Sequence, residues 1–359
     1  MDLLQEARKI INQVDSQMAD LFVQRMRAAE MVAEYKRAHG MPILDAEREE
    51  IVVRNGSARV EDERLREYYI DFMRDTMAVS RRYQQRLLHG MKVAYSGTEG
   101  AFAYIAADKL FHDAQKIAFP DFKAAYDSVV SGKCDVVVLP LENSYAGEVG
   151  QVTDLMFSGP LYVNYILPLS VTHDLLAVEG ATLETVKTVV SHPQALSQCD
   201  DFIRTHGYGQ IQYANTALAA KYVAERNDPT VAAIASGESA GRFGLTLLAE
   251  GINRSQVNTT RFAVLSRSEN RNISKQHGAH FILVFTVRNE AGSLAQALNI
   301  IGSHEFNMRT LRSRPMRELL WQYYFYVEAE GNIHSADGKE MLKELAVCCD
   351  KIKCVGSFI

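Results

Sequence analysis

A stripe of apolar residues at helical spacing near the start of the sequence is interrupted by one arginine, Arg25, which falls between Leu21 and Ala28. A guanidinium on the apolar face of a helix needs a partner anion, because an unpaired buried charge is costly. Lys36 follows eleven residues later, about three full turns, and therefore shares the face of Arg25. Arg8, seventeen residues before Arg25, points elsewhere by roughly a quarter turn. These cations predict a site that binds a small dianion.

Further polar residues at helical spacing follow the arginine. Asp45, Arg48 and Glu49 are spaced i, i+3, i+4 and share one face of a second helix, and Ser80 and Gln84 share a face of a third. Taken alone, each group is typical of a solvated helix face. The arginine within the apolar stripe favours a binding site instead. Cations, a carboxylate pair and neutral hydrogen-bonding groups suit a substrate with two carboxylates and several oxygens.

In order and in near-identical spacing, eight of these positions resemble the active-site pattern of helical (AroQ-type) chorismate mutases. The resemblance implies a concerted rearrangement of chorismate to prephenate, without cofactor or covalent intermediate, in an intertwined dimer where Arg8 reaches into the partner's site. Catalysis would be conformational capture and electrostatic stabilisation. The arginines would hold the carboxylates, Lys36 and Gln84 would donate to the breaking ether bond, and Glu49 would orient the ring hydroxyl. The eight positions are Arg8, Arg25, Lys36, Asp45, Arg48, Glu49, Ser80 and Gln84.

The elements that must position these residues are helices throughout residues 1–90. The apolar stripe predicts one helix of about 35 residues, roughly 50 Å long. Such a helix has no core of its own, so we expect another helix to cover it, from a second subunit. A third helix is predicted from Glu61 to Leu88. The stripe consists of Leu3, Ala7, Ile10, Val14, Met18, Leu21, Ala28 and Val32.

The middle of the chain, residues 91–268, alternates short β-branched runs with helical stretches, which predicts an α/β fold with a mostly parallel sheet. Polar loops containing Asn143, Ser191 and Ser236 follow three of the runs, at the strand ends where ligands bind in such folds. Each alone is more typical of a helix cap or turn. His192 is expected next to a site, whereas His112 and His173 are expected to be structural. The runs are 92–95, 135–139, 186–190 and 231–235.

Together these segments resemble prephenate dehydratase, through the motifs ENS at 142–144, SHPQ at 191–194, IAS at 234–236 and TTRF at 259–262. The resemblance implies two lobes that close on a ligand, as in periplasmic solute-binding proteins. It also implies decarboxylation of prephenate with loss of its ring hydroxyl, in which Thr260 assists the departing hydroxide. Arg261 would contribute charge or be structural. Thr98 and Ala103 stand where the family has proline and serine. The implied substrate-binding residues are Asn143, Ser144, Ser191, Gln198, Thr259 and Arg261.

After a polar stretch from Ser266 to Gly278, which we interpret as a linker, the order strand-helix-strand-strand-helix-strand predicts a ferredoxin-like module. Such a module is often an oligomerisation block. The motifs at 292–295 and 313–315 resemble an ACT domain, which implies that phenylalanine binds between two such domains, near Gly292, Leu294 and Ser313. Arg312 stands where the family has glutamate, and Ala291 stands where it has proline. A base in place of an acid beside the effector site is expected either to weaken inhibition by phenylalanine or to change the effector.

The bulk composition limits the remaining possibilities. A net charge of −5 argues against a nucleic-acid partner, and no apolar run reaches the roughly 18 residues of a membrane span. The start lacks the pattern of a signal peptide, and the five cysteines form neither a metal motif nor a disulfide framework, so a cytoplasmic location is expected.

The sequence therefore predicts a multidomain protein: an all-α mutase domain over 1–90, an α/β two-lobed dehydratase domain over 91–268 and an α+β ACT domain over 278–359. We expect a homo-oligomer, at least a dimer, that needs no cofactor and no metal. Two alternatives stay open at this point. The dehydratase substrate could be arogenate, or the chain could be a regulator or solute-binding protein without chemistry.

Overall fold

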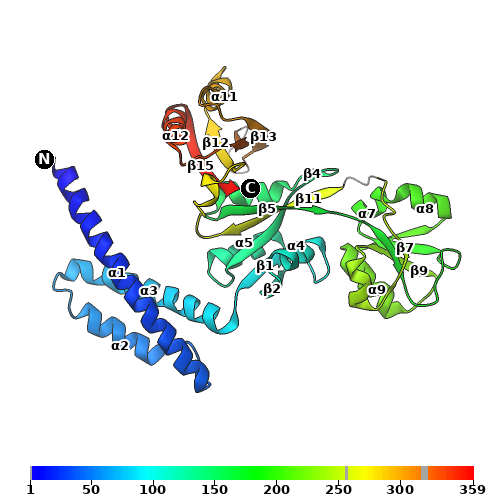
Figure 1. The fold of residues 1–359 in the computed structure, drawn as a ribbon, viewed down its shortest axis with the longest axis horizontal. Coiled ribbons are helices and arrows are strands. Elements are labelled where there is room, and N and C mark those ends of the chain that lie inside the picture. Colours follow the sequence, from blue (N-terminus) through cyan, green and yellow to red (C-terminus); the bar gives the residue numbers. More distant parts are fainter. Residues whose placement is uncertain (1, 255–257, 317–321) are drawn as a thin grey trace. The chain divides into compact units, whose positions relative to one another are not determined.

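The computed structural model describes residues 2–254, 258–316 and 322–359 (Figure 1). It divides into two compact units, Met1–Met91 and Lys92–Ile359. Within the described ranges, no helix is long and apolar enough to cross a membrane.

The first unit is helical, as predicted. Its long helix α1 covers 36 residues and begins after Asp2, whose side chain accepts a hydrogen bond from the backbone of Leu4. Most of the predicted apolar stripe is exposed in the single chain, with Leu21 at 61% and Ile10 at 59%. Only the second half of α1 is covered, by α3. The helices are α1 (Leu3–Ala38), α2 (Ala46–Ser57) and α3 (Glu63–His89).

The larger unit begins with a lobe whose sheet has the order β2-β1-β3-β11-β5, with β4 paired to β3. β1 is parallel to β2 and β3, whereas β11 runs antiparallel to both of its neighbours. Its strands are β1 (Lys92–Ser96), β2 (Gln115–Phe119), β3 (Val136–Asn143), β4 (Gly147–Glu148), β5 (Tyr162–Ser170) and β11 (Thr259–Ser266). Its helices are α4 (Phe102–Leu110), α5 (Phe122–Val130) and α6 (Gly150–Ser158).

A second lobe is inserted between β5 and β11, with a sheet of order β10-β6-β9-β7-β8 and its own core clusters. Figure 1 shows it as the green part built around β7 and β9. Its strands are β6 (Asp174–Ala177), β7 (Thr188–Ser191), β8 (Gly209–Gln212), β9 (Val231–Ala235) and β10 (Thr246–Ala249). Its helices are α7 (Pro193–Gln198), α8 (Asp200–His206), α9 (Thr216–Arg226) and α10 (Glu238–Phe243).

The chain thus crosses between the lobes twice, and this corrects the predicted mostly parallel sheet. β3 and β5 end at the boundary between the lobes, whereas β11 returns from the second lobe and begins there. Because β11 enters the first lobe at the boundary where β3 and β5 leave it, β11 must be antiparallel to both. β6 enters the second lobe in the same way and is antiparallel to β9. Both sheets are therefore mixed, although the two-lobed α/β arrangement is as expected.

The last part of the chain has the predicted order of elements, and its sheet order is β13-β14-β12-β15. Residues 266–278 are not a free linker, because they contain a short 3-10 helix and Ser274 is buried. The core of the first lobe extends into this part through Ile282 and Val355, among others. The elements are η1 (Ile273–Lys275), β12 (His280–Val287), α11 (Ser293–Ser303), β13 (Met308–Pro315), β14 (Tyr323–Glu330), α12 (Ala336–Cys348) and β15 (Cys349–Phe358).

Candidate active sites

A cavity of about 370 Å³ lies among the helices of the first unit, and we call it the helical cavity. It collects seven of the eight residues that the sequence pattern brought together. Arg8 does not line it and is exposed on α1. Its predicted place in a partner's site stays a prediction. The lining residues are Arg25, Ala28, Ala29, Val32, Lys36, Ile43, Asp45, Arg48, Glu49, Val52, Met77, Ser80, Arg81 and Gln84.

Arg25 is the cation that interrupts the apolar stripe, and the structure turns it toward α3. Its guanidinium donates to the hydroxyl oxygen of Ser80 and, over 3.4 Å, to the carbonyl oxygen of Thr76. Burial lowers the pKa of Arg25, and the negative charge of Glu49 opposes that effect. With no carboxylate hydrogen-bonded to it within the described residues, the guanidinium keeps its charge available to an anionic ligand.

Lys36 and Gln84 face the same cavity from α1 and α3, and both are buried. The Lys36 ammonium donates to the carbonyl oxygen of Ile43, which fixes its position and leaves two further donors. Gln84 Oε1 is buried without a hydrogen-bond partner among the residues described. Buried polar groups are rarely left unpaired, so this arrangement is suited to a polar ligand.

The second helix contributes two carboxylates. Asp45 caps α2 and accepts a hydrogen bond of 3.0 Å from the backbone of Arg48. Glu49 is bound by Arg81 of α3, whose Nη1 donates to both carboxylate oxygens. Sequence reasoning missed Arg81, although it stands three residues before Gln84 and therefore shares its helix face.

A larger cavity of about 720 Å³, the interlobe cleft, lies where the chain crosses between the lobes. Val171 and His173 come from the first crossing, and Asn258 comes from the second. Because β3 ends and β11 begins at this boundary, Asn143 and Thr260 are register partners beside it. The polar or ionisable residues of the lining are Ser96, Asn143, Glu148, His173, His192, Gln194, Gln198, Asn215, Thr216, Asn258 and Thr260.

Thr260 is held by an amide network. Asn143 Nδ2 donates to the Thr260 hydroxyl oxygen over 2.9 Å and to Asn258 Oδ1 over 2.7 Å. Asn143 Oδ1 accepts from the backbone of Tyr145 and Ala146. Because the Thr260 oxygen accepts a hydrogen bond from Asn143, the hydroxyl's own hydrogen can be directed to a ligand in the cleft. The hydrogen-bonding groups of the Asn143 amide are thus engaged within the protein, and one of these bonds positions Thr260.

Gln198 and His173 form the second polar group of the cleft. Gln198 Oε1 lies 2.7 Å from His173 Nε2 and accepts from Asn258 Nδ2 over 3.2 Å. An amide oxygen only accepts, so Nε2 carries the proton and Nδ1 is the acceptor. Both His173 Nδ1 and Gln198 Nε2 are buried without a partner among the described residues. Burial lowers the pKa of His173. The sequence predicts only a structural role for this residue, whereas the structure places it in the cleft lining.

Helix N-termini, rather than cationic side chains, supply the positive potential that an anion would meet in the cleft. Among the residues described, its lining contains no arginine or lysine. The first turns of α4 and α9 and the residue before α6 line it instead, and α4 and α6 have no side-chain cap on their first N–H groups. Free N–H groups at helix N-termini bind carboxylates. Phe102 of α4 adds an aromatic contact to His173, with ring centroids 5.9 Å apart.

Four residues expected to bind substrate do not line the cleft as described. Ser191 is fully buried and donates to the carbonyl oxygen of Ile234, which ties β7 to β9. Ser144 accepts from the backbone of Thr259 and so anchors its own loop. On β11, side chains alternate between faces, so Thr259 and Arg261 point away from the side on which Thr260 lies. The structure thus places these four residues outside the cleft lining, and their predicted contacts with a substrate stay predictions.

Arg261 belongs to an ion-pair network between the first lobe and the C-terminal sheet. It donates to Glu142 of β3 and to Glu328 of β14, and Arg312 of β13 also pairs with Glu142. Burial acts to raise the pKa of Glu142, but the two arginines outweigh it and lower that pKa. Arg314 donates to Asp154 of α6 over 3.0 Å and lies 3.5 Å from Glu148, which lines the cleft.

The expected effector residues occupy one end of the C-terminal sheet. Gly292 follows β12 and caps α11 with a φ of +88°, a conformation that favours glycine. Thr286 of β12 and Arg314 of β13 both pair with Tyr324 of the strand between them. The loop after β12 and Ser313 therefore lie at the same end, with Ser313 exposed.

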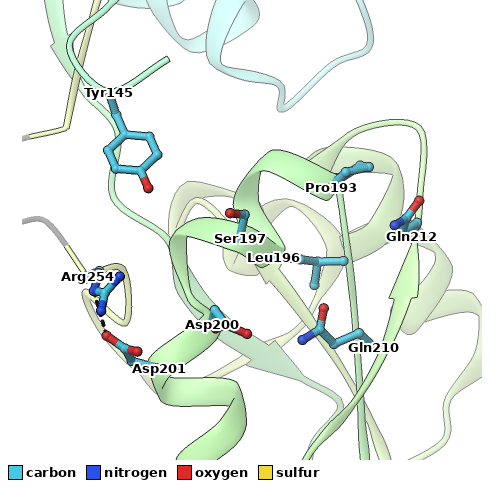
Figure 2. A pocket seen from close by; sticks show the side chains of 9 residues that line it. All are labelled: Tyr145, Pro193, Leu196, Ser197, Asp200, Asp201, Gln210, Gln212 and Arg254. Atoms are coloured by element: carbon cyan, nitrogen blue, oxygen red, sulfur yellow. Dashed lines mark ion pairs between the residues drawn. The ribbon is translucent and has the colours of Figure 1, made fainter.

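A smaller hollow of about 350 Å³ opens on the second lobe (Figure 2). Figure 2 shows Tyr145 and Arg254 opposite α7 and α8, with Arg254 paired to Asp201 over 2.8 Å. Asp200 also lines it. The two carboxylates make this hollow poorly suited to a dianion, whereas the interlobe cleft offers amides and helix N-termini. Among the described residues, no cluster of three His, Cys, Asp or Glu could hold a metal ion.

Two family models match the chain: chorismate mutase type II over residues 7–85 and prephenate dehydratase over residues 93–270. A bifunctional chorismate mutase/prephenate dehydratase from Enterobacter agglomerans is 30% identical, over 98% of this chain and 94% of its own length. Among solved structures, prephenate dehydratase from Arthrobacter aurescens in complex with L-Phe aligns with a TM-score of 0.68 at 24% identity, over 75% of this chain and 89% of its own. A quorum quenching acylase, GqqA, aligns with a TM-score of 0.67 at 26% identity, over 74% of this chain and 97% of its own.

Proposed function

The chain belongs to the family of bifunctional chorismate mutase/prephenate dehydratases, and from this premise we propose how its two sites divide the work. The protein is an enzyme of phenylalanine biosynthesis. Its helical unit rearranges chorismate to prephenate, and its larger unit converts prephenate to phenylpyruvate. The helical cavity and the interlobe cleft are the proposed places of the two reactions.

In the helical cavity, one carbon–oxygen bond of chorismate breaks while one carbon–carbon bond forms, and no atom is gained or lost. Arg25 and Arg48 bind the two carboxylates, and Arg8 of a second copy completes the grip. Lys36 and the Gln84 amide donate to the ether oxygen, where negative charge grows as its bond breaks. Glu49 orients the ring hydroxyl, with Asp45 and Ser80 in support. The Gln84 donor in this step is Nε2, whereas the buried Oε1, which has no partner among the described residues, can accept a hydrogen bond from a donor group of the ligand.

In the interlobe cleft, prephenate loses its ring carboxylate as CO₂ and its ring hydroxyl as hydroxide, which takes up one proton to leave as water. The electron pair of the carbon–carboxylate bond becomes part of the aromatic ring. Thr260 donates a hydrogen bond to the departing hydroxyl. A bare threonine is a weak acid, so this hydrogen bond, rather than full proton transfer, is the contribution we assign to it. Gln198, with His173 beside it, binds the ligand's oxygens.

One observation carries the dehydratase proposal: Asn143 donates to the Thr260 oxygen and thereby directs the Thr260 proton away from itself. The test is a product assay on the purified full chain. Chorismate is supplied and prephenate and phenylpyruvate are followed against time, with arogenate as a second substrate for the cleft. Prephenate should rise first and phenylpyruvate after it. No turnover of chorismate would leave the chain a binding protein and refute the proposal.

The C-terminal part is proposed to be an ACT domain, residues 278–359, that binds phenylalanine near Gly292, Leu294 and Ser313. The three-domain division 1–90, 91–268 and 278–359 belongs to the same proposal. Support comes from the sheet order, from the glycine cap of α11 and from a related dehydratase structure described as a complex with L-Phe. Arg312 pairs with Glu142 of β3, and Arg314 lies 3.5 Å from Glu148 of the cleft lining, so these contacts offer a route for inhibition.

A dimer is proposed because the apolar stripe of α1 is uncovered in the single chain. An α1 helix of a second copy has a matching apolar face, and it would bring Arg8 to the helical cavity. A cytoplasmic location stays a prediction from the sequence.

A further inference from the structure

Arg81 lies in the wall of the helical cavity but belongs to none of the eight positions of the mutase pattern. It projects from α3 between Ser80 and Gln84, the two residues by which α3 contributes to the site. Its Nη1 donates to both oxygens of the Glu49 carboxylate on α2. The side chains are 31% and 26% exposed, so the pair is partly shielded from water.

The charges around the cavity explain what such a pair can do. Four cationic and two acidic side chains line it. Asp45 is engaged at the start of α2, where it accepts a hydrogen bond from the backbone of Arg48. Glu49 is close enough to Arg25 for its charge to act on that guanidinium. A Glu49 carboxylate without its own cation would therefore compete with the carboxylates of a dianionic substrate for Arg25.

Geometry adds a second effect. A glutamate side chain has several rotamers, and an arginine that binds both of its oxygens selects one of them. The carboxylate bound by Arg81 is the one expected to orient the ring hydroxyl of chorismate. A fixed carboxylate costs less ordering when the substrate binds and keeps the reacting conformer aligned.

We propose that Arg81 is a positioning residue of the chorismate mutase site, which fixes the Glu49 carboxylate and keeps Arg25 available to the substrate. The inference rests on the proposed mutase function. Arg81 acts through Glu49 and does not itself touch the reacting atoms.

The experiment uses the full chain and compares Arg81→Met with Arg81→Lys. Arg86→Met is the matched control, because Arg86 is an exposed residue of the same helix outside the cavity lining. Initial rates with chorismate give kcat and KM, and rates with supplied prephenate give the dehydratase activity of the same sample. Arg81→Met should lower mutase kcat/KM by roughly 10- to 100-fold, and the dehydratase rate should stay unchanged. Arg81→Lys should recover part of the loss, since a lysine supplies the charge but has a shorter side chain than Arg81, whose Nη1 reaches both oxygens of Glu49.

A double-mutant cycle tests whether Arg81 acts through Glu49. In an enzyme that already carries Glu49→Gln, the residue to be positioned has no charge, so adding Arg81→Met should cause little further loss. Independent losses that multiply would overturn the proposal, and so would an Arg81→Met enzyme within about twofold of Arg86→Met. If Arg81→Met fails to fold, Arg81→Lys takes its place, and full wild-type kcat/KM in that variant would overturn the proposal, because it would show that the reach of the guanidinium to both Glu49 oxygens is not needed. A wild-type chain without chorismate turnover would refute the mutase function itself.

Discussion

The side-chain amide of Asn143 donates to the hydroxyl oxygen of Thr260 over 2.9 Å, across the register pair that joins the end of β3 to the start of β11. A hydroxyl that accepts from an amide is polarised and becomes a better donor. The pair therefore places a strengthened donor at the base of the interlobe cleft.

Replacing Thr260 by alanine should remove this donor and lower phenylpyruvate formation by roughly 10²- to 10³-fold, the usual cost of one donor to a developing negative charge. Thr260→Ser should retain much of the activity because it keeps the hydroxyl. Mutase turnover of the same chain is the internal reference, and Thr259→Ala is the matched control one residue earlier. A Thr260→Ala enzyme that forms phenylpyruvate at the wild-type rate would contradict the assigned role.

Lys36→Ala should lower mutase turnover by roughly 10²- to 10³-fold, because it removes a cationic donor from the ether oxygen of the transition state. The fold should survive, since the ammonium is bonded to one backbone carbonyl and the neighbouring buried Ala33 packs independently. Three measurements on one preparation check this prediction. Chorismate decay gives the mutase rate, circular dichroism reports the helical content, and the dehydratase rate reports the rest of the chain. Near-normal chorismate decay would exclude Lys36 from the proposed role.

Val14→Lys on the exposed face of α1 should prevent a second copy from packing there, because a charge would have to be buried against an apolar partner. Sedimentation at several protein concentrations should then show a smaller species. If Arg8 acts in the partner's site, mutase activity falls with the loss of association and dehydratase activity persists. A variant that remains associated and active as a mutase would show that this face is not the interface.

Arg312→Glu should weaken inhibition by phenylalanine. A glutamate here would face Glu142, so an ion pair between β13 and the first lobe becomes a repulsion. Coupling energies between sites are commonly worth a 5- to 150-fold change in affinity, and we expect the half-inhibitory concentration to rise by roughly 5-fold or more. A phenylalanine titration of prephenate turnover measures it. The double variant Arg312→Glu with Glu142→Arg should restore part of the inhibition, because it re-forms an ion pair of reversed sign. An unchanged phenylalanine titration of Arg312→Glu would show that this ion pair takes no part in regulation.

His173 predicts a dependence of stability on pH. Burial holds its pKa in the folded protein below the ordinary value of 6.5, so below that pH the unfolded chain binds the proton more readily. The free energy of unfolding contributed by this group therefore falls as pH drops through 6.5 toward the folded pKa. Thermal denaturation of wild type and His173→Gln at several pH values measures the difference. His277→Gln, at an exposed position, should follow the wild-type curve.

The sequence predicted the helical unit best, because its signals are local. The stripe along α1, the break near residue 40 and the i, i+4 spacings fix both the helices and the face on which Arg25, Lys36 and Gln84 meet. The grouping of seven predicted residues around one cavity follows from these spacings. Arg81 was missed because a lone arginine on an amphipathic helix resembles any solvated charge, and its partner is thirty-two residues away.

The larger unit was predicted less completely, since its cleft is made by chain crossings rather than by motifs. His173 and Asn258 stand on connections between lobes, where no periodicity marks them. Ser191 and Arg261 belong to motifs of the family, but their side chains bind neighbouring strands. Ser191 donates to the carbonyl oxygen of Ile234, and Arg261 pairs with Glu142. Strand direction also depends on topology: β11 is antiparallel to β3 because of where the chain returns from, which local sequence does not encode.

One pairing has a consequence for the order in which the protein is made. Gly356 of β15 pairs with Val163 of β5, with a φ of +142° and no room for a side chain against the Val163 backbone. β15 thereby lies between β12 and β5 and joins the C-terminal sheet to the sheet of the first lobe. The helical unit is fully synthesised by residue 91, whereas β5 waits nearly two hundred residues for this neighbour. On the ribosome, the helical unit can therefore fold early, while the edge of β5 stays open until the last strand of that sheet has emerged.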